Sequence, residues 1–193
     1  MNNGAPTAAT TVRPAGTASI WTTGRLDRLD SAADEWRVDS QFDPTLNRTV
    51  STGNTCFDSA SCHGVWIDGY DPFLDLTDES ILAINYGFFV LRTDPGDNEK
   101  YKDIEDWDVL FNTTGSGHPV FTYSSAGSSD TNIFDVQGVA THELGHSILL
   151  IDLYAGCHRG TSMETMCGTV NGIESTRLRS IQTDDINGAN LIY

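Results

Sequence analysis

Lysine is almost absent from this sequence, and basic residues as a class are scarce. Lys100 and Lys102 are its two lysines, and 11 basic residues stand against 27 acidic ones, which gives a formal net charge of −16. Proteins that bind nucleic acids or anionic membranes neutralise phosphate groups with clustered Lys and Arg. The composition therefore argues against a nucleic-acid or membrane partner and favours a well-solvated acidic exterior, with calcium binding as the sharper alternative.

Long apolar runs are also missing. Hydrophobic residues make up 38% of the 193 positions, and no apolar run approaches the eighteen or so residues of a membrane span. The segment from Met1 to Ser19 is rich in Ala, Thr, Pro and Gly and contains no hydrophobic signal core. We expect residues 1–19 to be a flexible N-terminal tail and residues 20–193 to form one domain, which we expect to be a monomer.

Cysteine is limited to four residues, and none of them has the Cys-x-x-Cys spacing of a structural zinc site. They fall into two short pairs, Cys56/Cys62 and Cys157/Cys167. An even count favours two disulfides and an oxidising compartment, so we expect a secreted protein; reduced core thiols are the alternative. A Cys157–Cys167 bond would constrain the loop between Asp152 and Met166.

The most informative stretch is His142-Glu143-Leu144-Gly145-His146. Residues four apart lie on the same face of a helix, so His142 and His146 can direct two imidazoles to one point. Apolar residues at 136, 139, 140, 144 and 148 give the segment a helical period, and Asp135 would favour the N-terminal end of the helix dipole. Two histidines beside a carboxylate predict zinc-assisted hydrolysis with Glu143 as the base, although such a pair can also be merely hydrogen-bonded.

A catalytic zinc normally takes three protein ligands, and Asp152 is the nearest candidate for the third. A continued helix would carry Asp152 about 9 Å beyond His146, so the chain must turn back near residues 148–150. Glycine usually makes such a turn, but Leu149 stands at this position, where a left-handed conformation costs about 1–2 kcal/mol. His158 and Glu164 are the rival third ligands, although residues 161–168 look like a turn and not a helix.

The remaining pattern predicts an α+β fold with a mixed sheet. We expect a helix over Leu26–Val38, a buried strand over Ser80–Arg92, a strand over Asp108–Asn112 and an edge strand over Pro119–Ser124. The turn Asp94–Glu99 carries side-chain oxygens that could bind structural Ca²⁺. His63 and His118 lie in Gly-containing segments, and we expect them at the surface and not among the metal ligands.

The motif and its surroundings resemble the metzincin zinc peptidases of the matrixin-like branch. The metzincin pattern is His-Glu-x-x-His-x-x-Gly-x-x-His or Asp, and an aspartate in the third position, as in the snapalysin-like members, matches Asp152. Met166 resembles the methionine of the family's Met-turn, which packs under the metal without binding it. Residues 104–112, 134–141 and 179–193 are similar to a family strand, the approach to the zinc helix and the C-terminal helix. Leu149 departs from the family glycine, and Gly168 stands where some relatives have a tyrosine ligand.

The resemblance implies a metzincin-like catalytic domain with a mixed, twisted β-sheet, a zinc-binding active-site helix and a C-terminal helix. It further implies a secreted zinc metalloendopeptidase in which His142, His146 and Asp152 hold Zn²⁺ and Glu143 is the catalytic base. Protein or peptide substrates would pair with an exposed strand near residues 119–124, and residues 167–180 would form much of the specificity wall. A catalytically weak or inactive domain that binds peptides or proteins is the alternative, motivated by Leu149.

Overall fold

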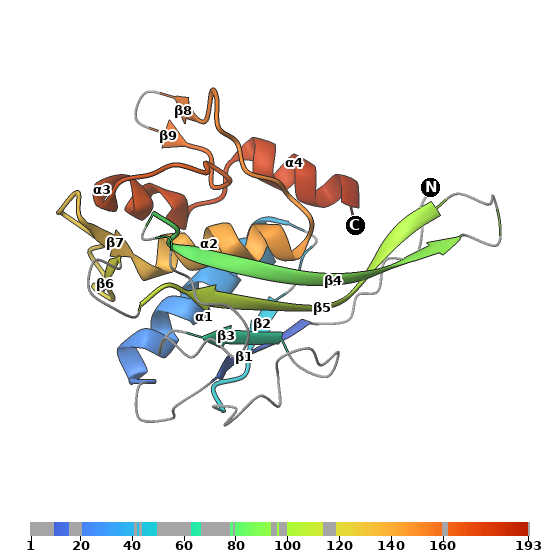
Figure 1. Cartoon of the computed structure of the whole chain (residues 1–193), viewed down its shortest axis with the longest axis horizontal. Helices are drawn as coiled ribbons and strands as arrows, with labels where there is room; N and C mark the ends of the chain where they lie inside the picture. The colour runs from blue at the N-terminus through green and yellow to red at the C-terminus, as the bar shows by residue number, and fades with distance from the viewer. Residues whose placement is uncertain are drawn as a thin grey trace.

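The computed structural model describes residues 10–15, 21–40, 42, 44–49, 63–66, 78, 80–93, 96, 100–113, 119–159 and 162–192. Within these ranges, helices and a mixed β-sheet form an α+β fold, which confirms the fold class expected from the sequence (Figure 1). No helix in the described part of the chain has the length and apolar character needed to cross a membrane.

The main sheet has five strands in the order β2-β1-β3-β5-β4 among the described residues. These strands are β1 (Thr10–Ala15), β2 (Pro44–Leu46), β3 (His63–Trp66), β4 (Ala83–Thr93) and β5 (Lys100–Phe111). The pairs β1–β2, β1–β3 and β3–β5 are parallel, whereas β4 runs antiparallel to β5. The antiparallel strand β4 therefore forms one edge of the sheet.

The first strand corrects the expected N-terminal tail, because Thr10–Ala15 lie inside the sheet between β2 and β3. The remainder of residues 1–19 is outside the described residues. The tail was expected from the composition of this segment, which includes Pro14, and proline is rare within sheets. The structure accommodates it because β2 pairs only with Thr10–Val12, so that at Pro14 the strand has a described neighbour on one side, β3.

The strand expected at Ser80–Arg92 corresponds to β4, but only part of it is buried. Phe88, Phe89, Val90 and Leu91 are at least 39% exposed, because β4 and β5 continue as a two-stranded ribbon beyond the body of the sheet (Figure 1). The strand expected at Asp108–Asn112 is the end of the longer β5. The apolar run in Ser80–Arg92 was interpreted as a buried strand, but the same run also occurs in a strand that projects into solvent.

Two further expectations about the sheet need correction. Val120–Thr122 form strand β6 as expected, but β6 pairs in parallel with β7 (Ile133–Asp135) in a separate small sheet, so the main-sheet edge nearest the site is β4. His63, expected on the surface, begins β3 and stacks on Trp107 with ring centroids 4.7 Å apart. The glycine that suggested a loop there, Gly64, is instead required by a close approach: a Cβ at this position would lie 2.7 Å from Asp108 Oδ1.

Two helices supply a large part of the core. Helix α1 (Thr23–Asp39) includes the helix expected at Leu26–Val38 and buries Leu29, Ala32, Ala33 and Trp36. Helix α2 (Val136–Ser147) is buried along almost its whole length and packs against α1 and the sheet. The indole Nε1 of Trp36 donates to the carbonyl oxygen of Thr141 at 2.8 Å, which ties the two helices together. Helix α2 is therefore fixed by its packing against α1 and the sheet before any ligand is considered.

The C-terminal part of the chain covers the side of α2 away from the sheet in the view of Figure 1. It contains the hairpin β8 (His158–Arg159) and β9 (Ser162–Met163), the short helix α3 (Gly172–Ser175), the 3₁₀ helix η2 (Thr176–Arg179) and helix α4 (Thr183–Ile192). Asp135 is the N-cap of α2 and accepts a hydrogen bond from the Gly138 amide at 2.7 Å. The Arg179 guanidinium pairs with the same carboxylate at 2.6 Å, so the C-terminal part is anchored at the start of α2.

Arg179→Met should strongly destabilise the fold, because it removes the ion-pair partner of the fully buried Asp135 carboxylate. Removing one partner of a buried ion pair typically costs about 3–5 kcal/mol. The free energy of unfolding in urea should fall by that amount. The control is Arg37→Met, since Arg37 pairs with Asp34 in solvent and such exposed pairs contribute about 1 kcal/mol or less. Similar losses in the two variants would contradict this role for Arg179.

Candidate metal centre

The two histidines of the motif lie on one face of α2, one helical turn apart. Nε2 of His142 is 3.1 Å from Nε2 of His146 and 3.1 Å from Oδ1 of Asp152. Nε2 of His146 is 3.5 Å from the same Oδ1. In a tetrahedral zinc site with bonds of roughly 2.0–2.1 Å, ligand atoms lie about 3.3 Å apart. The three donor atoms therefore have the spacing that one zinc ion requires, as the sequence predicted.

Backbone carbonyls orient both imidazole rings. Nδ1 of His142 lies 2.7 Å from the carbonyl oxygen of Thr165, and Nδ1 of His146 lies 2.7 Å from that of Leu150. A carbonyl only accepts hydrogen bonds, so each Nδ1 carries the proton and each Nε2 directs a lone pair toward its neighbour and toward Asp152. Hydrogen bonds of this kind fix the tautomer of metal-binding histidines. Two lone pairs and a carboxylate meeting at one point repel one another, and a cation relieves that repulsion.

The electrostatics also favour positive charge at this point. Burial opposes protonation of Nε2 of His142, but the Asp152 carboxylate that would accept a hydrogen bond from that proton, the charge of Glu143 and the Thr165 carbonyl together raise the pKa of His142 above its ordinary value. A proton on Nε2 would thus take the place of the cation: the hydrogen bond it would make to Asp152, against the opposing effect of burial, holds the pKa of that carboxyl at about 2. Asp152 is therefore ionised at neutral pH and available as an anionic ligand.

The chain returns Asp152 to the histidines through a left-handed residue at the end of α2. Leu149 has a φ of 67°, which makes it the one non-glycine residue with positive φ among the described residues. The Leu149 amide donates to the carbonyl of His146, and the Leu150 amide donates to that of Gly145. This pattern is the Schellman motif that ends many helices, with leucine in the position glycine normally takes. The left-handed turn considered from the sequence is present, with leucine in it.

Met166 lies directly beneath α2. A Cβ on Gly145 would come within 2.3 Å of Met166 Sδ, so the glycine is what lets the methionine approach the helix so closely. The chain on either side is fixed: the Leu153 amide donates to the Met166 carbonyl, and the Gly168 amide donates to the Leu153 carbonyl. Met166 is buried and thus forms part of the floor of the site, in the turn predicted from the sequence.

The predicted disulfide between Cys157 and Cys167 is present, with Cα atoms 5.4 Å apart. It closes the loop between Asp152 and Met166 next to the site. The second predicted pair, Cys56 and Cys62, lies outside the described residues, as do His118 and most of the Asp94–Glu99 turn.

Glu143 is buried beside the three donors. Among the described residues, no hydrogen-bond donor reaches its Oε2 atom. Burial raises the pKa of the Glu143 carboxyl, the two histidines oppose this rise, and the charge of Asp152 adds to it. A carboxyl whose pKa is raised in this way is closer to the neutral range in which a general base and acid must exchange a proton.

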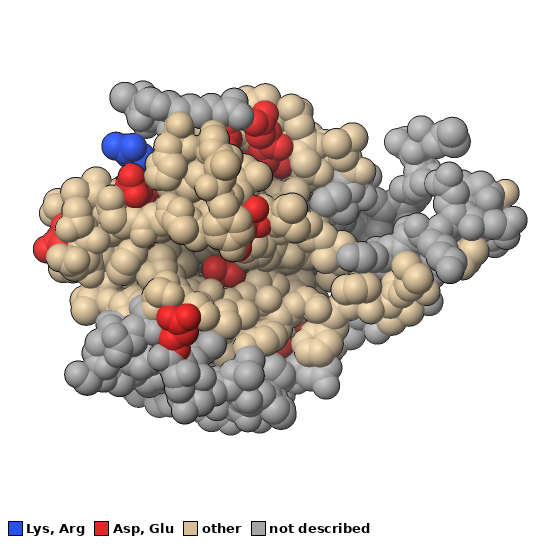
Figure 2. All heavy atoms as spheres, turned by 45° about the horizontal axis from the view of Figure 1, so that its top comes forward, with Lys and Arg blue, Asp and Glu red and all other residues tan. Residues whose placement is uncertain are grey.

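The site opens into a cavity of about 690 Å³. Figure 2 shows this face of the molecule, with a hollow that has acidic side chains in and around it. One wall is the start of β4 and the residues before it, Ser80–Asn85; the opposite wall includes Gly168, Thr169 and Val170. Asn85 ties the first wall to α2, because its Nδ2 donates to the Glu143 carbonyl at 2.8 Å and to Ser147 Oγ at 2.7 Å.

Tyr154 is a site residue that the sequence analysis missed. Its hydroxyl donates to Oδ2 of Asp152 at 2.9 Å, so the carboxylate oxygen that faces away from the histidines is also held. Its ring packs against Gly168, where a Cβ would lie 2.8 Å from Tyr154 Cε1. The spacing of two residues after Asp152 was the available signal, because alternate residues of an extended segment lie on one side.

The two rival third ligands are elsewhere. His158 groups with Cys157 and Cys167, away from the His142 and His146 pair. Glu164 is buried in the turn before Met166 and is not part of the group around the histidines. Asp152 is thus the residue that the fold brings to the two histidines.

A comparison with models of known protein families found no match for this chain, and a search of curated proteins found none either. What the site can do must therefore be inferred from its own geometry.

Leu149→Gly should stabilise the protein by about 1 kcal/mol, because glycine adopts positive φ without the steric cost that leucine bears. Leu149→Ala is the matched control: it removes the leucine side chain but keeps the Cβ that causes the strain. The free energies of unfolding of the three proteins, measured in urea, separate the two effects. A glycine variant no more stable than the alanine variant would show that the turn carries no backbone strain.

Proposed function

We propose that this chain is a zinc-dependent endopeptidase of the metzincin type. The observation that carries the proposal is the convergence of His142 Nε2, His146 Nε2 and Asp152 Oδ1, at zinc-ligand spacing, beside the buried carboxylate of Glu143. Met166 beneath the helix and the left-handed turn at Leu149 also match what the sequence resemblance implies. Nitrogen and oxygen donors of this kind suit Zn²⁺ in sites that hydrolyse peptide bonds.

When bound, zinc would supply a water of lowered pKa and a positive charge for the developing oxyanion. The chain's own residues do the rest. Glu143 takes the proton of the attacking water at a carboxylate oxygen and delivers it to the leaving amine. Tyr154 holds Oδ2 of Asp152, which keeps Oδ1 directed at the histidines. The hydrogen bonds to Thr165 and Leu150 prevent the imidazoles from rotating away.

The substrate class follows from the walls of the cavity. The antiparallel edge strand β4 begins in the cavity wall, and an extended polypeptide can add to such an edge through main-chain hydrogen bonds. The hydrogen bond from Asn85 to the Glu143 carbonyl holds this edge at a fixed distance from α2. A segment bound along the edge would therefore lie at a fixed distance from Glu143. We therefore assign extended protein or peptide segments as substrates. The buried Cys157–Cys167 disulfide supports secretion as the setting.

A non-catalytic peptide-binding domain was the alternative, because Leu149 might have kept the third ligand away. Asp152 reaches the histidines despite Leu149, so this reason no longer holds. A binding domain would also have no use for a buried carboxylate such as Glu143 at this position. The endopeptidase is accordingly the function we propose.

Glu143→Gln should lower the rate of peptide cleavage at least about 100-fold, the usual contribution of a general base. Glutamine has nearly the same shape but cannot accept the proton, so zinc content should stay at the wild-type level. Cleavage of an unstructured protein such as casein, together with elemental analysis, measures both quantities. Wild-type turnover in this variant would refute the proposed mechanism.

Asp152→Ala should sharply weaken zinc retention, because it removes one of three ligands. His158→Ala is the control, since it removes a rival candidate that lies in another group of side chains. Dialysis of both variants against a chelator, followed by zinc analysis, gives the order of retention. Faster zinc loss from the His158 variant would transfer the third-ligand role to His158.

A further inference from the structure

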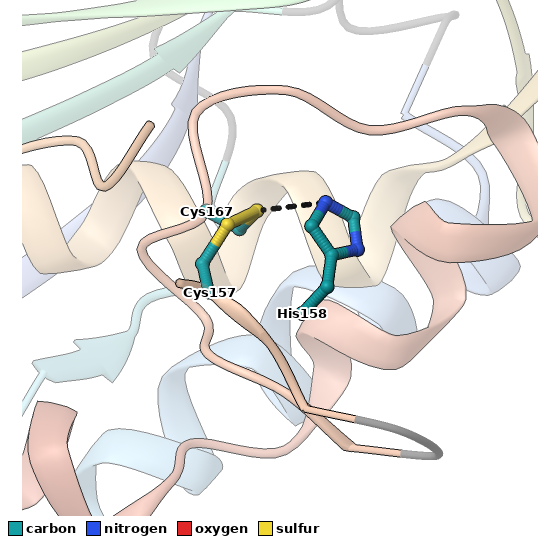
Figure 3. A group of neighbouring side chains, drawn as sticks. All are labelled: Cys157, His158 and Cys167. Carbon is teal, nitrogen blue, oxygen red and sulfur yellow. Dashed lines mark hydrogen bonds between the residues drawn. A yellow bond between two sulfur atoms is a disulfide. The ribbon is translucent and has the colours of Figure 1, made fainter. Parts of the chain in front are cut away.

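A second group of metal-binding side chains lies outside the His142–Asp152 centre. Cys157, His158 and Cys167 place their ligand atoms within 4.8 Å of one another (Figure 3). The two cysteines are buried and joined as a disulfide, whereas the His158 side chain is 48% exposed. The group thus has a buried sulfur side and a side open to solvent.

His158 is oriented toward the sulfurs. Its Nε2 lies 3.5 Å from Cys167 Sγ, and its Nδ1 lies 3.7 Å from Oε1 of Glu174. The Glu174 carboxylate is itself fixed, because its Oε2 accepts a hydrogen bond from the Asn171 amide at 3.0 Å. The disulfide sulfur can only accept, so Nε2 donates to Cys167 Sγ in the oxidised protein. With the Glu174 carboxylate on the Nδ1 side, a shift of the proton to Nδ1 after reduction would free the Nε2 lone pair for a metal. Metal-binding histidines are commonly held by a carboxylate in this manner.

We infer that Cys157, His158 and Cys167 form a second zinc site, which becomes available when the disulfide is reduced. A dithiol reductant transfers two electrons and two protons, so that the S–S bond breaks into two thiols and the reductant closes to its own disulfide. Zn²⁺ then displaces the two thiol protons, binds both sulfurs and Nε2 of His158, and leaves its fourth position to water. Two thiolates and an imidazole are donors that zinc prefers.

The distances fit this site with little movement. Zinc bonds of roughly 2.3 Å to sulfur and 2.0–2.1 Å to nitrogen place a thiolate and an imidazole nitrogen about 3.6 Å apart. The Sγ–Nε2 distance of 3.5 Å between Cys167 and His158 already has this value. The two sulfurs must separate to about 3.8 Å in tetrahedral geometry, and breaking their bond allows that.

The position of the group suggests what such a site would do. Cys167 follows Met166 and forms a β-bridge with Leu153, one residue after Asp152. The disulfide closes this loop in the oxidised protein, and bound zinc would close it again in the reduced protein. Metal at the second site would therefore preserve the floor of the first centre under reducing conditions.

Cobalt(II) is a suitable probe, because thiolate ligands give it an intense near-ultraviolet charge-transfer band that nitrogen and oxygen ligands do not. The His142, His146 and Asp152 centre contains no sulfur, so the band reports the second site alone and does not depend on peptide cleavage. The protein is titrated with Co²⁺ without oxygen, before and after treatment with a water-soluble phosphine. This reductant takes an oxygen atom from water, whose protons pass to the two sulfurs.

The band should be absent from the oxidised protein and, after reduction, reach the intensity of one sulfur-bound Co²⁺ per chain. His158→Ala should largely remove it, and Glu174→Gln, which keeps an oxygen acceptor for Asn171, should weaken Co²⁺ affinity about tenfold or more. The Cys157→Ser/Cys167→Ser double variant, which retains Cys56 and Cys62, should show no band.

Three results would overturn the inference. They are the absence of a band in the reduced wild type, an undiminished band in His158→Ala or in the double serine variant, and loss of the near-ultraviolet circular dichroism of the fold on reduction. Loss of the circular dichroism would contradict the inference because the zinc site requires the fold to hold Cys157, His158 and Cys167 together after reduction.

Discussion

Two imidazole lone pairs and a carboxylate oxygen are held against one another at 3.1–3.5 Å, and the architecture around them keeps them there. Such an arrangement is unfavourable without a positive charge at its centre. Hydrogen bonds prevent the three groups from turning away from one another. The carbonyls of Thr165 and Leu150 accept from Nδ1 of His142 and His146, and the Tyr154 hydroxyl donates to Oδ2 of Asp152. A cation at that point converts three repulsive contacts into three attractive ones.

The stiffness that this requires comes from packing remote from the site. Helix α2 is buried against α1 and the sheet, capped by Asp135, and tied through Arg179 to the C-terminal part that carries Met166. The disulfide closes the loop that brings Asp152 and Met166 together. Among the described residues, Leu149 is the one non-glycine residue with a left-handed backbone, and it returns the chain to the metal centre. A small cost of about 1–2 kcal/mol there is compatible with a core of this size.

The parts of the structure that depend on local sequence were predictable. The four-residue spacing of His142 and His146, the apolar period of α2, the turn at Leu149 and the Cys157–Cys167 pair are all set by neighbours within about ten positions. The predictions that were wrong concern residues whose structure depends on partners far away in the sequence. Pro14 and His63 lie in strands because β1 and β3 pair in parallel about fifty positions apart, and His63 also stacks on the distant Trp107. Tyr154 was missed because its role rests on a single hydrogen bond.

X-ray absorption at the zinc edge of the purified, oxidised protein tests the central claim most directly. With one zinc per chain, the spectrum should show nitrogen and oxygen ligands at about 2.0–2.1 Å, including the multiple-scattering signature of two imidazoles, and no sulfur. Asp152→Ala should lose one oxygen ligand or the metal itself. A protein that takes up no zinc after reconstitution, or one whose zinc is bound by sulfur at about 2.3 Å, would contradict a metal centre at His142, His146 and Asp152.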